Sequence, residues 1–361
     1  MQKQWGRQGL PHYHLKYPIL SYSKIHCMRI AIVKLSALGD IVHAMVVLQF
    51  IKKNHPNAII DWIVEKSFKE ILANNPDINQ IYTVSIKKAK QQKSFKLLFK
   101  EFKKLRKLQR YDIVIDAQGL VKSAIVSRLI PSDVTFGFDK DSLRESFAAK
   151  FYTHTCKIDY SENIIKRNAF VMASALNFNI LNDDILNKKS FLYSSCKSKF
   201  SELSKDKPNI LLIPGASFES KIYPVEKYAE LTKQLDANFI VLWGNESEKK
   251  MASQIQKLSP IIKITNKLTL DELKSFIAQA DLVIGGDTGP THMAWALNIS
   301  SITLFGSTPG YRNTFATDIN QIIESDSQVN PYKINKNDFS IKEIRVGDIV
   351  KIAQELLTNK K

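Results

Sequence analysis

A run of ten residues in the second half of the chain, 284–293, has the composition of an anion-binding turn. It reads Ile-Gly-Gly-Asp-Thr-Gly-Pro-Thr-His-Met, and the apolar residues before it are typical of a buried strand. The glycines permit close backbone approach, and Pro290 suits the first turn of a helix. Backbone N–H groups of Thr288 and Gly289 would then face a phosphate, while Asp287 is suited to hold a sugar hydroxyl. On local grounds, an ordinary capped turn accounts for these residues equally well.

Similar turns end three other apolar runs of the second half, at residues 214–217, 244–246 and 306–308. Helical patterns at 225–235 and 270–280 lie between them, so strands and helices alternate as they do around a parallel sheet. Ligands of such sheets bind beyond the carboxyl ends of the strands, where these turns gather. No Gly-x-Gly-x-x-Gly run follows a strand, which argues against a standard NAD site.

The first half shows the same alternation, with strands expected at 29–35, 59–65 and 112–116, a turn at 36–40 and a helix at 41–53. Two doubly wound α/β domains follow from this pattern. We therefore divide the chain into an extension at 1–27, a Rossmann-like domain at 28–190, a linker at 191–207, a second Rossmann-like domain at 208–335 and a closing helix within 336–361. The extension lacks a secretory apolar core, and we interpret it as either disordered or the product of an early start codon.

Positive charge is concentrated in the first half. The chain has a net charge of +17, and residues 1–190 contribute +15, from 31 Lys and Arg against 16 Asp and Glu. The density peaks at 87–110, where eleven basic residues accompany one acid. Apolar side chains recur there at helical spacing, namely Phe95, Leu98, Phe99, Phe102 and Leu105. We expect a basic amphipathic helix whose apolar stripe packs mainly on its own domain and whose cationic face meets an anionic partner.

Nucleic acid is a poor candidate for that partner, because the charge lies on one half, without interleaved aromatic residues or a known nucleic-acid motif. Cys27, Cys156 and Cys196 form no closely spaced pair, so the sequence indicates neither a disulfide framework nor a zinc site and suits a reducing cytosol. No apolar run approaches the roughly 18 residues of a membrane span, so contact with lipid is expected to be peripheral.

Four motifs in fixed order carry a family resemblance. They are Met-Arg-Ile-Ala-Ile-Val-Lys-Leu-Ser-Ala-Leu-Gly-Asp-Ile-Val-His at 28–43, Ile-Asp-Ala-Gln-Gly-Leu-Val-Lys-Ser-Ala at 115–124, Gly-Phe-Asp at 137–139 followed by Arg-Glu at 144–145 and Phe-Tyr at 151–152, and Asp-Thr-Gly-Pro-Thr-His at 287–292. Together they resemble the lipopolysaccharide heptosyltransferase I family of glycosyltransferase family 9. The resemblance implies a GT-B fold, in which two Rossmann-like domains face each other across a cleft. It also implies inverting transfer of L-glycero-D-manno-heptose from ADP-heptose to the Kdo of Kdo-lipid A, in a Gram-negative source, with neither metal nor cofactor.

The resemblance also implies which residues form the site. Asp40 matches the family's catalytic base, although a first-turn or N-cap aspartate would suit that position equally on local grounds. Lys221 matches a phosphate-contacting lysine, and in so basic a chain the alternative is a surface lysine. The donor-binding candidates are Ser217, Lys221, Glu248 (or Glu246) for the ribose, Leu268 for the adenine, Asp287, Thr288, Gly289 and His292. The acceptor-binding candidates are Lys87, Lys88, Lys122 and Arg144.

The nearest alternative function is that of heptosyltransferase II or another sugar transferase of the same family. The Asp-Ala-Gln-Gly-Leu-Val-Lys motif at 116–122 favours the first enzyme. A nucleotide-sugar epimerase and a non-catalytic binding protein of the same fold are more distant alternatives. The presence of Asp40 as a possible base argues against a non-catalytic binding protein. We expect a cytoplasmic protein in peripheral contact with the anionic leaflet of the inner membrane, with ADP-heptose and Kdo-lipid A as partners and no nucleic acid.

Overall fold

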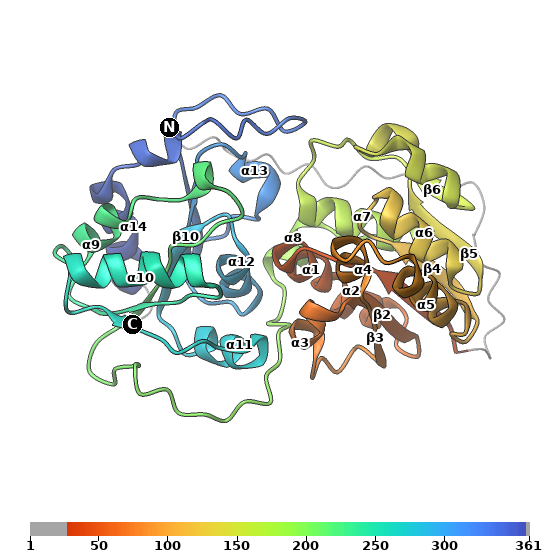
Figure 1. The fold of residues 1–361 in the computed structure, drawn as a ribbon, viewed down its shortest axis with the longest axis horizontal. Helices are drawn as coiled ribbons and strands as arrows, with labels where there is room; N and C mark the ends of the chain where they lie inside the picture. The colour runs from red at the N-terminus through yellow and green to blue at the C-terminus, as the bar shows by residue number, and fades with distance from the viewer. Residues whose placement is uncertain (1–26, 359–361) are drawn as a thin grey trace. The chain divides into compact units, whose positions relative to one another are not determined.

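The structure, a computed structural model, describes residues 27–358, so nearly all of the predicted extension at 1–27 lies outside the described residues. The chain forms two compact units (Figure 1). Among the described residues, one unit comprises 27–35, 44–65 and 77–188, and the other comprises 36–43, 66–76 and 189–358. Each unit contains a six-stranded parallel sheet, which confirms the prediction of two doubly wound Rossmann-like domains.

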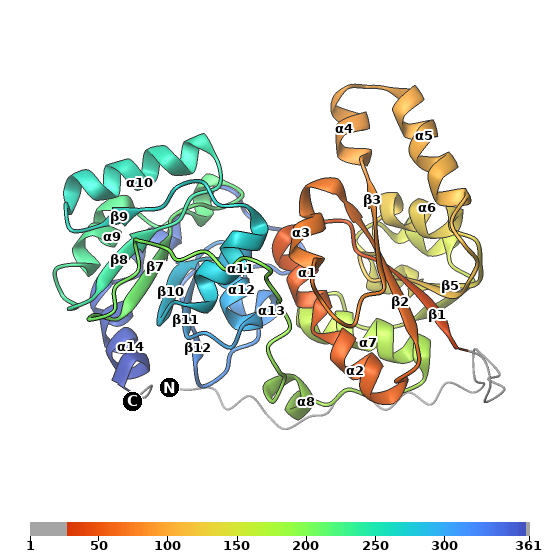
Figure 2. The same cartoon turned by 90° about the horizontal axis from the view of Figure 1, so that it is seen from below.

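The sheet of the first unit consists of β1 (Arg29–Val33), β2 (Ile59–Glu65), β3 (Gln80–Val84), β4 (Tyr111–Asp116), β5 (Ser132–Phe138) and β6 (His154–Cys156). Their order across the sheet is β3-β2-β1-β4-β5-β6. The helices around it are α2 (Val47–Asn54), α4 (Ile86–Gln91), α5 (Phe95–Arg106), α6 (Val121–Leu129), α7 (Ile164–Leu176) and α8 (Asn182–Leu186), with 3-10 turns η2 (Lys140–Ser142) and η3 (Ser146–Phe151) (Figure 2). The central strands are buried apolar runs, as a parallel sheet covered on both faces requires.

The sheet of the second unit consists of β7 (Asn209–Ile213), β8 (Asn238–Val241), β9 (Lys263–Ile264), β10 (Leu282–Gly286), β11 (Ser301–Phe305) and β12 (Asn320–Glu324). Their order is β12-β11-β10-β7-β8-β9. The helices are α9 (Val225–Leu231), α10 (Glu246–Leu258), α11 (Leu270–Ala278), α12 (Gly289–Ala296), α13 (Gly310–Asn313) and α14 (Val346–Thr358), with 3-10 turns η4 (Glu219–Lys221) and η5 (Ser340–Glu343). One core cluster of this unit, which includes Tyr223, Tyr228 and Phe239, packs between strands and helices.

Two predicted helices are each divided in the structure. The helix expected at 41–53 forms α1 (Leu38–Met45) and α2, which are separated at Val46, a residue whose backbone keeps right-handed helical angles. The basic stretch 87–110 forms α4 and α5, and Lys93 in the turn between them has a φ of 48°. The expectation that the apolar stripe of this stretch packs mainly on its own domain is confirmed for Leu98 and Leu105, but the side chains of Phe95 and Phe99 are exposed.

Two segments that come before residue 190 pack with the second unit. One is 36–43, which contains most of α1, and the other is 66–76, which contains η1 (Lys66–Phe68) and α3 (Lys69–Leu72). The division predicted from sequence, with a single continuous first domain at 28–190, does not anticipate these two segments.

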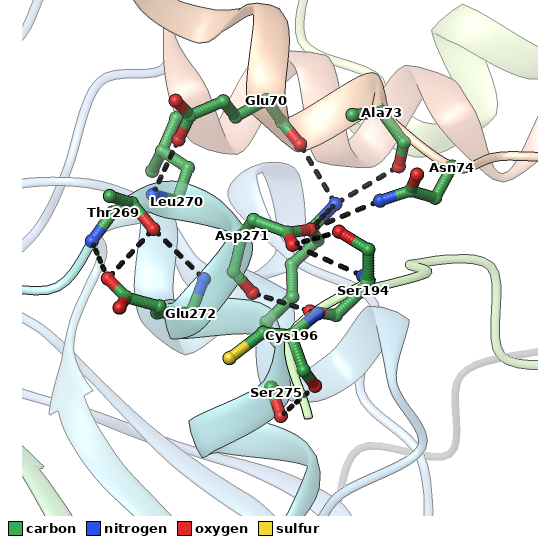
Figure 3. A network of polar contacts seen from close by, with 12 residues as sticks. Glu70, Ala73, Asn74, Ser194, Cys196, Thr269, Leu270, Asp271, Glu272 and Ser275 are labelled. Atoms are coloured by element: carbon green, nitrogen blue, oxygen red, sulfur yellow. Dashed lines mark hydrogen bonds and ion pairs between the residues drawn. The ribbon is translucent and has the colours of Figure 1, made fainter. Parts of the chain in front are cut away.

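The segment 66–76 is held by hydrogen bonds to α11 (Figure 3). The buried ammonium group of Lys274 donates to the backbone oxygens of Glu70 at 2.8 Å and Ala73 at 3.1 Å, and it lies 3.0 Å from the carboxylate of Asp271. The Glu70 carboxylate in turn accepts from the backbone N–H of Leu270. Burial lowers the pKa of Lys274, and Asp271 opposes that shift. Because a buried ammonium group is costly unless it is fully hydrogen-bonded, these contacts fix the segment to the second unit.

Candidate active site

Each sheet has one point at which the strand order reverses, and ligands of doubly wound sheets bind beyond the carboxyl ends of the strands at such a point. In the second sheet this point lies between β7 and β10, and in the first it lies between β1 and β4. The turn 214–217 follows β7 and Asp287 follows β10, whereas Asp40 follows β1 and the motif 116–122 begins at the end of β4. Of the predicted site residues, Asp40, Ser217, Asp287 and Lys122 therefore lie near these two points.

The turn after β10 has the predicted strand–turn–helix form. β10 ends at Gly286, Thr288 is the N-cap residue with extended backbone angles, and α12 begins at Gly289 with Pro290 in its first turn. A Cβ atom on Gly286 would lie 3.0 Å from the backbone oxygen of Lys221, so glycine permits the close approach of the segment that carries this lysine. The amino end of α12 and the Lys221 segment thus lie beside one turn.

Asp287 lies at the centre of a buried polar cluster. Its Oδ2 accepts hydrogen bonds from Lys221 Nζ at 2.5 Å, Asn313 Nδ2 at 3.1 Å and Thr308 Oγ1 at 3.2 Å. Its Oδ1 lies 3.0 Å from His292 Nε2. The side chains of Lys221 and Asp287 are each 10% exposed. Burial acts to raise the pKa of Asp287, but the charge of Lys221 and the hydrogen bond with His292 outweigh it and hold that pKa well below its usual range.

Three of these residues were predicted as donor ligands, and the structure brings all three together. Thr308 and Asn313 were not predicted. Thr308 lies in the turn after β11. Because turns after neighbouring parallel strands lie close together, its position after a predicted strand could have identified it as a site residue. Asn313 lies at the end of the short helix α13, where the sequence carries no comparable signal.

The beginnings of α1 and α12 are in close contact. A Cβ atom on Gly39 would lie 2.7 Å from His292 Cδ2, and one on Gly289 would lie 2.5 Å from Leu38 Cδ2. Such distances are far below van der Waals contact, so both positions require glycine for this packing. The segment 36–43 therefore belongs to the surroundings of the Asp287 cluster.

Asp40 lies directly after Gly39 in the first turn of α1. Its Oδ2 accepts a hydrogen bond from the backbone N–H of Ala37 at 3.1 Å, as a first-turn aspartate is expected to do. Within the described residues its Oδ1 has no hydrogen bond, and the side chain is half-buried. One turn further along α1, the ring of His43 packs 4.3 Å from that of His292. Asp40 therefore combines a helix-capping contact with one oxygen available next to the cluster.

Glu248, rather than Glu246, packs against the turn after β7. A Cβ atom on Gly215 would lie 2.5 Å from the Glu248 carboxyl carbon. The carboxylate accepts hydrogen bonds from the backbone N–H of Gly244 at 2.6 Å and from Asn245 Nδ2 at 2.7 Å. Glu246 is exposed.

Two further donor candidates lie beyond the carboxyl ends of strands of the same sheet. Ser217 is exposed in the turn after β7, four residues before Lys221, and Leu268 is half-buried between β9 and α11. The half-buried Trp243 lies two residues after the end of β8, and its indole N–H donates to the backbone oxygen of Thr265 at 2.7 Å. This tryptophan was not predicted as a site residue.

On the first unit, Glu65 links two of the predicted acceptor residues. Its Oε1 accepts from the backbone N–H of Lys87 at 2.9 Å and lies 4.0 Å from Lys122 Nζ. Burial raises the pKa of Glu65, and the contacts with Lys87 and Lys122 act against that shift. Glu65 was not predicted, although its position at the end of β2 is one where ligand-side residues gather.

Arg144 also lies near the beginning of α6. It pairs with Glu145 at 3.8 Å, and the other oxygen of Glu145 accepts from the backbone N–H of Val121 at 2.8 Å. Lys88, the fourth candidate, is exposed on α4. Three of the four candidates are thus connected to the first turns of α4 and α6.

The turn before α6 is shaped by the buried Asp116. Its Oδ1 accepts from the backbone N–H groups of Gln118 and Gly119, and its Oδ2 accepts from Tyr152 Oη at 2.8 Å. Gly119 has a φ of 70°, a conformation that favours glycine. Burial raises the pKa of Asp116, and its hydrogen bonds oppose that shift. Asp116 therefore serves to hold the turn that leads to Lys122.

Between residues 27 and 358, no group of three or more His, Cys, Asp or Glu side chains is placed to hold a metal ion. In the same part of the chain, no helix is both long enough and apolar enough to cross a membrane.

Two Rossmann-like units, one with a lysine–carboxylate cluster beside a helix amino end at its switch point, are typical of glycosyltransferases of the GT-B class. A family model described as glycosyltransferase family 9 (heptosyltransferase) matches residues 98–339. The chain belongs to this family, which confirms the predicted resemblance and the predicted enzyme class. The alternatives of an epimerase and a non-catalytic binder are thereby set aside.

Known relatives agree with this assignment. Lipopolysaccharide heptosyltransferase 1 of Campylobacter coli is 42% identical over 91% of this chain and 99% of its own length. Lipopolysaccharide heptosyltransferase 1 of Pseudomonas aeruginosa is 28% identical over 80% of this chain and 81% of its own length. Among solved structures, E. coli heptosyltransferase WaaC with ADP has a TM-score of 0.74 at 23% identity, covering 91% of this chain and all of that one, and it supports the fold.

Proposed function

We propose that this chain transfers L-glycero-D-manno-heptose from ADP-heptose to the Kdo of Kdo-lipid A, with inversion at the anomeric carbon. The observation that carries the proposal is the Lys221–Asp287–His292 cluster at the switch point, in a chain of the heptosyltransferase family. The similarity to proteins named lipopolysaccharide heptosyltransferase 1 favours the first heptose transfer over that of heptosyltransferase II.

The donor's diphosphate would be stabilised by Lys221 and by the backbone N–H groups at the amino end of α12. Asp287 holds the lysine in place, and its Oδ1 face is available to a sugar hydroxyl beside His292. Glu248 is suited to the ribose because it packs beside the turn after β7. Leu268 would contact the adenine, and Ser217 the phosphates.

Asp40 would act as the general base. The acceptor hydroxyl oxygen attacks the anomeric carbon, the bond between that carbon and the phosphate oxygen breaks, and ADP leaves with the bonding electrons. The proton of the attacking hydroxyl passes to the Asp40 carboxylate. Because Oδ2 already accepts a hydrogen bond from Ala37, Oδ1 is the oxygen suited to take this proton.

The acceptor carries carboxylates and phosphates, which suit Lys87, Lys88, Lys122 and Arg144. Since lipid A is anchored in a bilayer, the enzyme would act at the cytoplasmic face of the inner membrane, in peripheral contact with its anionic leaflet. The eleven basic residues of 87–110 support such a contact.

An assay of ADP or nucleotide release tests this function. ADP-heptose with Kdo-lipid A should give turnover, whereas UDP- and GDP-sugars, or ADP-heptose without the acceptor, should give none above hydrolysis. Equal turnover with another nucleotide sugar would contradict the proposal that ADP-heptose is the donor. Efficient use of an acceptor that already carries one heptose, but not of Kdo-lipid A, would instead identify a later transferase.

A further inference from the structure

We propose that Phe95 and Phe99 of α5 insert into an anionic phospholipid bilayer, so that the α4–α5 pair is the membrane-docking surface of this enzyme. The inference deepens the proposed function, on which it rests for the identity of the bilayer as the surface that carries the acceptor. The Phe95 and Phe99 side chains lie four residues apart and therefore on the same face of the helix.

These two side chains are the most exposed large apolar groups of residues 27–358, at 87% for Phe95 and 69% for Phe99. Such exposure is unfavourable in water and is unusual for an apolar pair that a fixed helix presents together. An apolar partner that covers them would remove this cost.

The helix itself is firmly attached to its domain, so the exposure does not come from a loose segment. Leu105 is buried, and the partly buried Leu98 packs against the core cluster of the first unit. Lys104 Nζ donates to the backbone oxygen of Thr83 at 2.6 Å, and Ser94 caps the amino end by accepting from Leu97 N–H. The side of α5 that bears Leu98 and Leu105 is packed, and the phenylalanine side faces outward.

Exposed cations lie on α5 together with the phenylalanines and on the neighbouring α4. Lys96, Lys100 and Lys103 are exposed on α5, as are Lys87, Lys88 and Lys90 on α4 (Figure 2 shows the two helices side by side). Of the eleven basic residues at 87–110, only Arg110 forms an ion pair within the described part of the chain, with Asp133. An anionic bilayer offers both phosphates for the ammonium groups and hydrocarbon for the rings. A second copy of the chain would bring the same positive charge and be repelled.

The test is partitioning of the full chain onto vesicles that contain anionic phospholipid, compared with vesicles of neutral phospholipid alone. Phe95→Ser combined with Phe99→Ser should lower partitioning onto anionic vesicles by about tenfold or more. The matched control is Leu258→Ser combined with Ile261→Ser, which removes two exposed apolar side chains, 50% and 61% exposed, from the second unit. The control should partition as the unchanged chain does.

A charge variant separates the two contributions. Lys96→Gln combined with Lys100→Gln should weaken partitioning at low salt and have less effect at high salt, whereas the phenylalanine variant should be impaired at both. Unchanged partitioning of the phenylalanine variant, an equal loss in the Leu258 and Ile261 control, or sedimentation showing a dimer that depends on the phenylalanines would overturn the proposal.

Turnover with a water-soluble Kdo acceptor that lacks acyl chains should be unaffected by the phenylalanine change, because these side chains lie outside the candidate site. If no acceptor is used at all while vesicle binding still depends on Phe95 and Phe99, the proposed function fails and the docking surface stands.

Discussion

Lys221 and Lys96 carry the same charge in opposite surroundings. Lys221 is almost buried and is paired with Asp287 within a cluster of four donors, whereas Lys96 projects from α5 into water beside exposed Phe95 and Phe99. The first arrangement fixes one cation in one position. The second spreads many cations over a surface without fixing any of them.

The difference shows what each region is suited to do. A desolvated, hydrogen-bonded cation interacts strongly with a diphosphate whose negative charge increases as ADP leaves. Salt screens this interaction little, because the cation is buried. Exposed cations contribute weakly one by one, add up along a charged surface and are screened at physiological salt. The second unit therefore has the charge organisation of a catalytic site, and the basic helices of the first unit have that of a docking surface.

The largest predicted effect is the loss of donor binding when the buried lysine is removed. Lys221→Ala should weaken ADP and ADP-heptose alike, by about 100-fold or more. It removes the cation that faces the diphosphate and leaves the buried Asp287 carboxylate, without its ammonium partner, to repel that diphosphate. Lys233→Ala, at an exposed position of the same unit, is the control and should bind both normally. Calorimetry with each ligand measures the effect. Normal ADP affinity in the Lys221 variant would place the diphosphate elsewhere.

Asp287→Ala should discriminate between the same two ligands. Removing the carboxylate frees the charge of Lys221 to act on the diphosphate, which offsets part of the loss for ADP. It also removes the oxygen beside His292 that we propose to bind the sugar. ADP-heptose should therefore be weakened more than ADP. Equal losses for both ligands would show that Asp287 acts only by positioning Lys221.

Stability should depend on pH through the same carboxylate. Since the pKa of Asp287 is held below its usual range, its charged form stabilises the folded chain above the unfolded-state pKa of about 3.9, and this contribution is lost as the pH falls below that value. Asp287→Asn should lower the free energy of unfolding by about 3 kcal/mol near neutral pH, and the difference should narrow below about pH 4. Urea unfolding across that range measures it. A difference that is constant down to acid pH would refute the linkage, and exposed Asp236→Asn is the control.

The smallest predicted effect concerns the exposed cations. Changing Lys87, Lys88 and Lys90 to Gln should raise the apparent Michaelis constant for Kdo-lipid A and flatten its salt dependence, while donor affinity stays unchanged. With about 1 kcal/mol for each cation near an anionic surface, the three together account for about tenfold or more at low salt. Initial rates over a salt series measure this. If the triple change leaves the apparent Michaelis constant for Kdo-lipid A unaltered, these lysines belong to a solvated helix that does not contact the acceptor.

The sequence was sufficient to predict elements whose signals are local. The apolar run and glycine-rich turn around Asp287 define a strand, a turn and a helix without any other part of the chain, and the structure has all three. The alternation of such units was enough to predict two parallel sheets.

Contacts between distant segments could not be predicted from the sequence. Thr308 and Asn313 reach Asp287 from another strand end and from a four-residue helix, and periodicity does not reveal such convergence. The same limit applies to segment 36–43. Its pattern predicts a turn followed by the start of a helix, but not the unit on which the segment packs. For Phe95 and Phe99, helical spacing identified the face they share, but spacing does not tell whether a face packs on its own domain or is exposed.

The most direct test of the central claim, that this chain is an inverting heptosyltransferase with its base beside the Asp287 cluster, is Asp40→Asn. The asparagine oxygen can still accept from the backbone N–H of Ala37, so α1 should begin as before, but the side chain cannot take the acceptor proton. The account predicts that turnover of ADP-heptose with Kdo-lipid A falls by about 100-fold or more, while calorimetric affinity for ADP-heptose stays near that of the unchanged chain. Turnover close to normal in this variant would contradict the account.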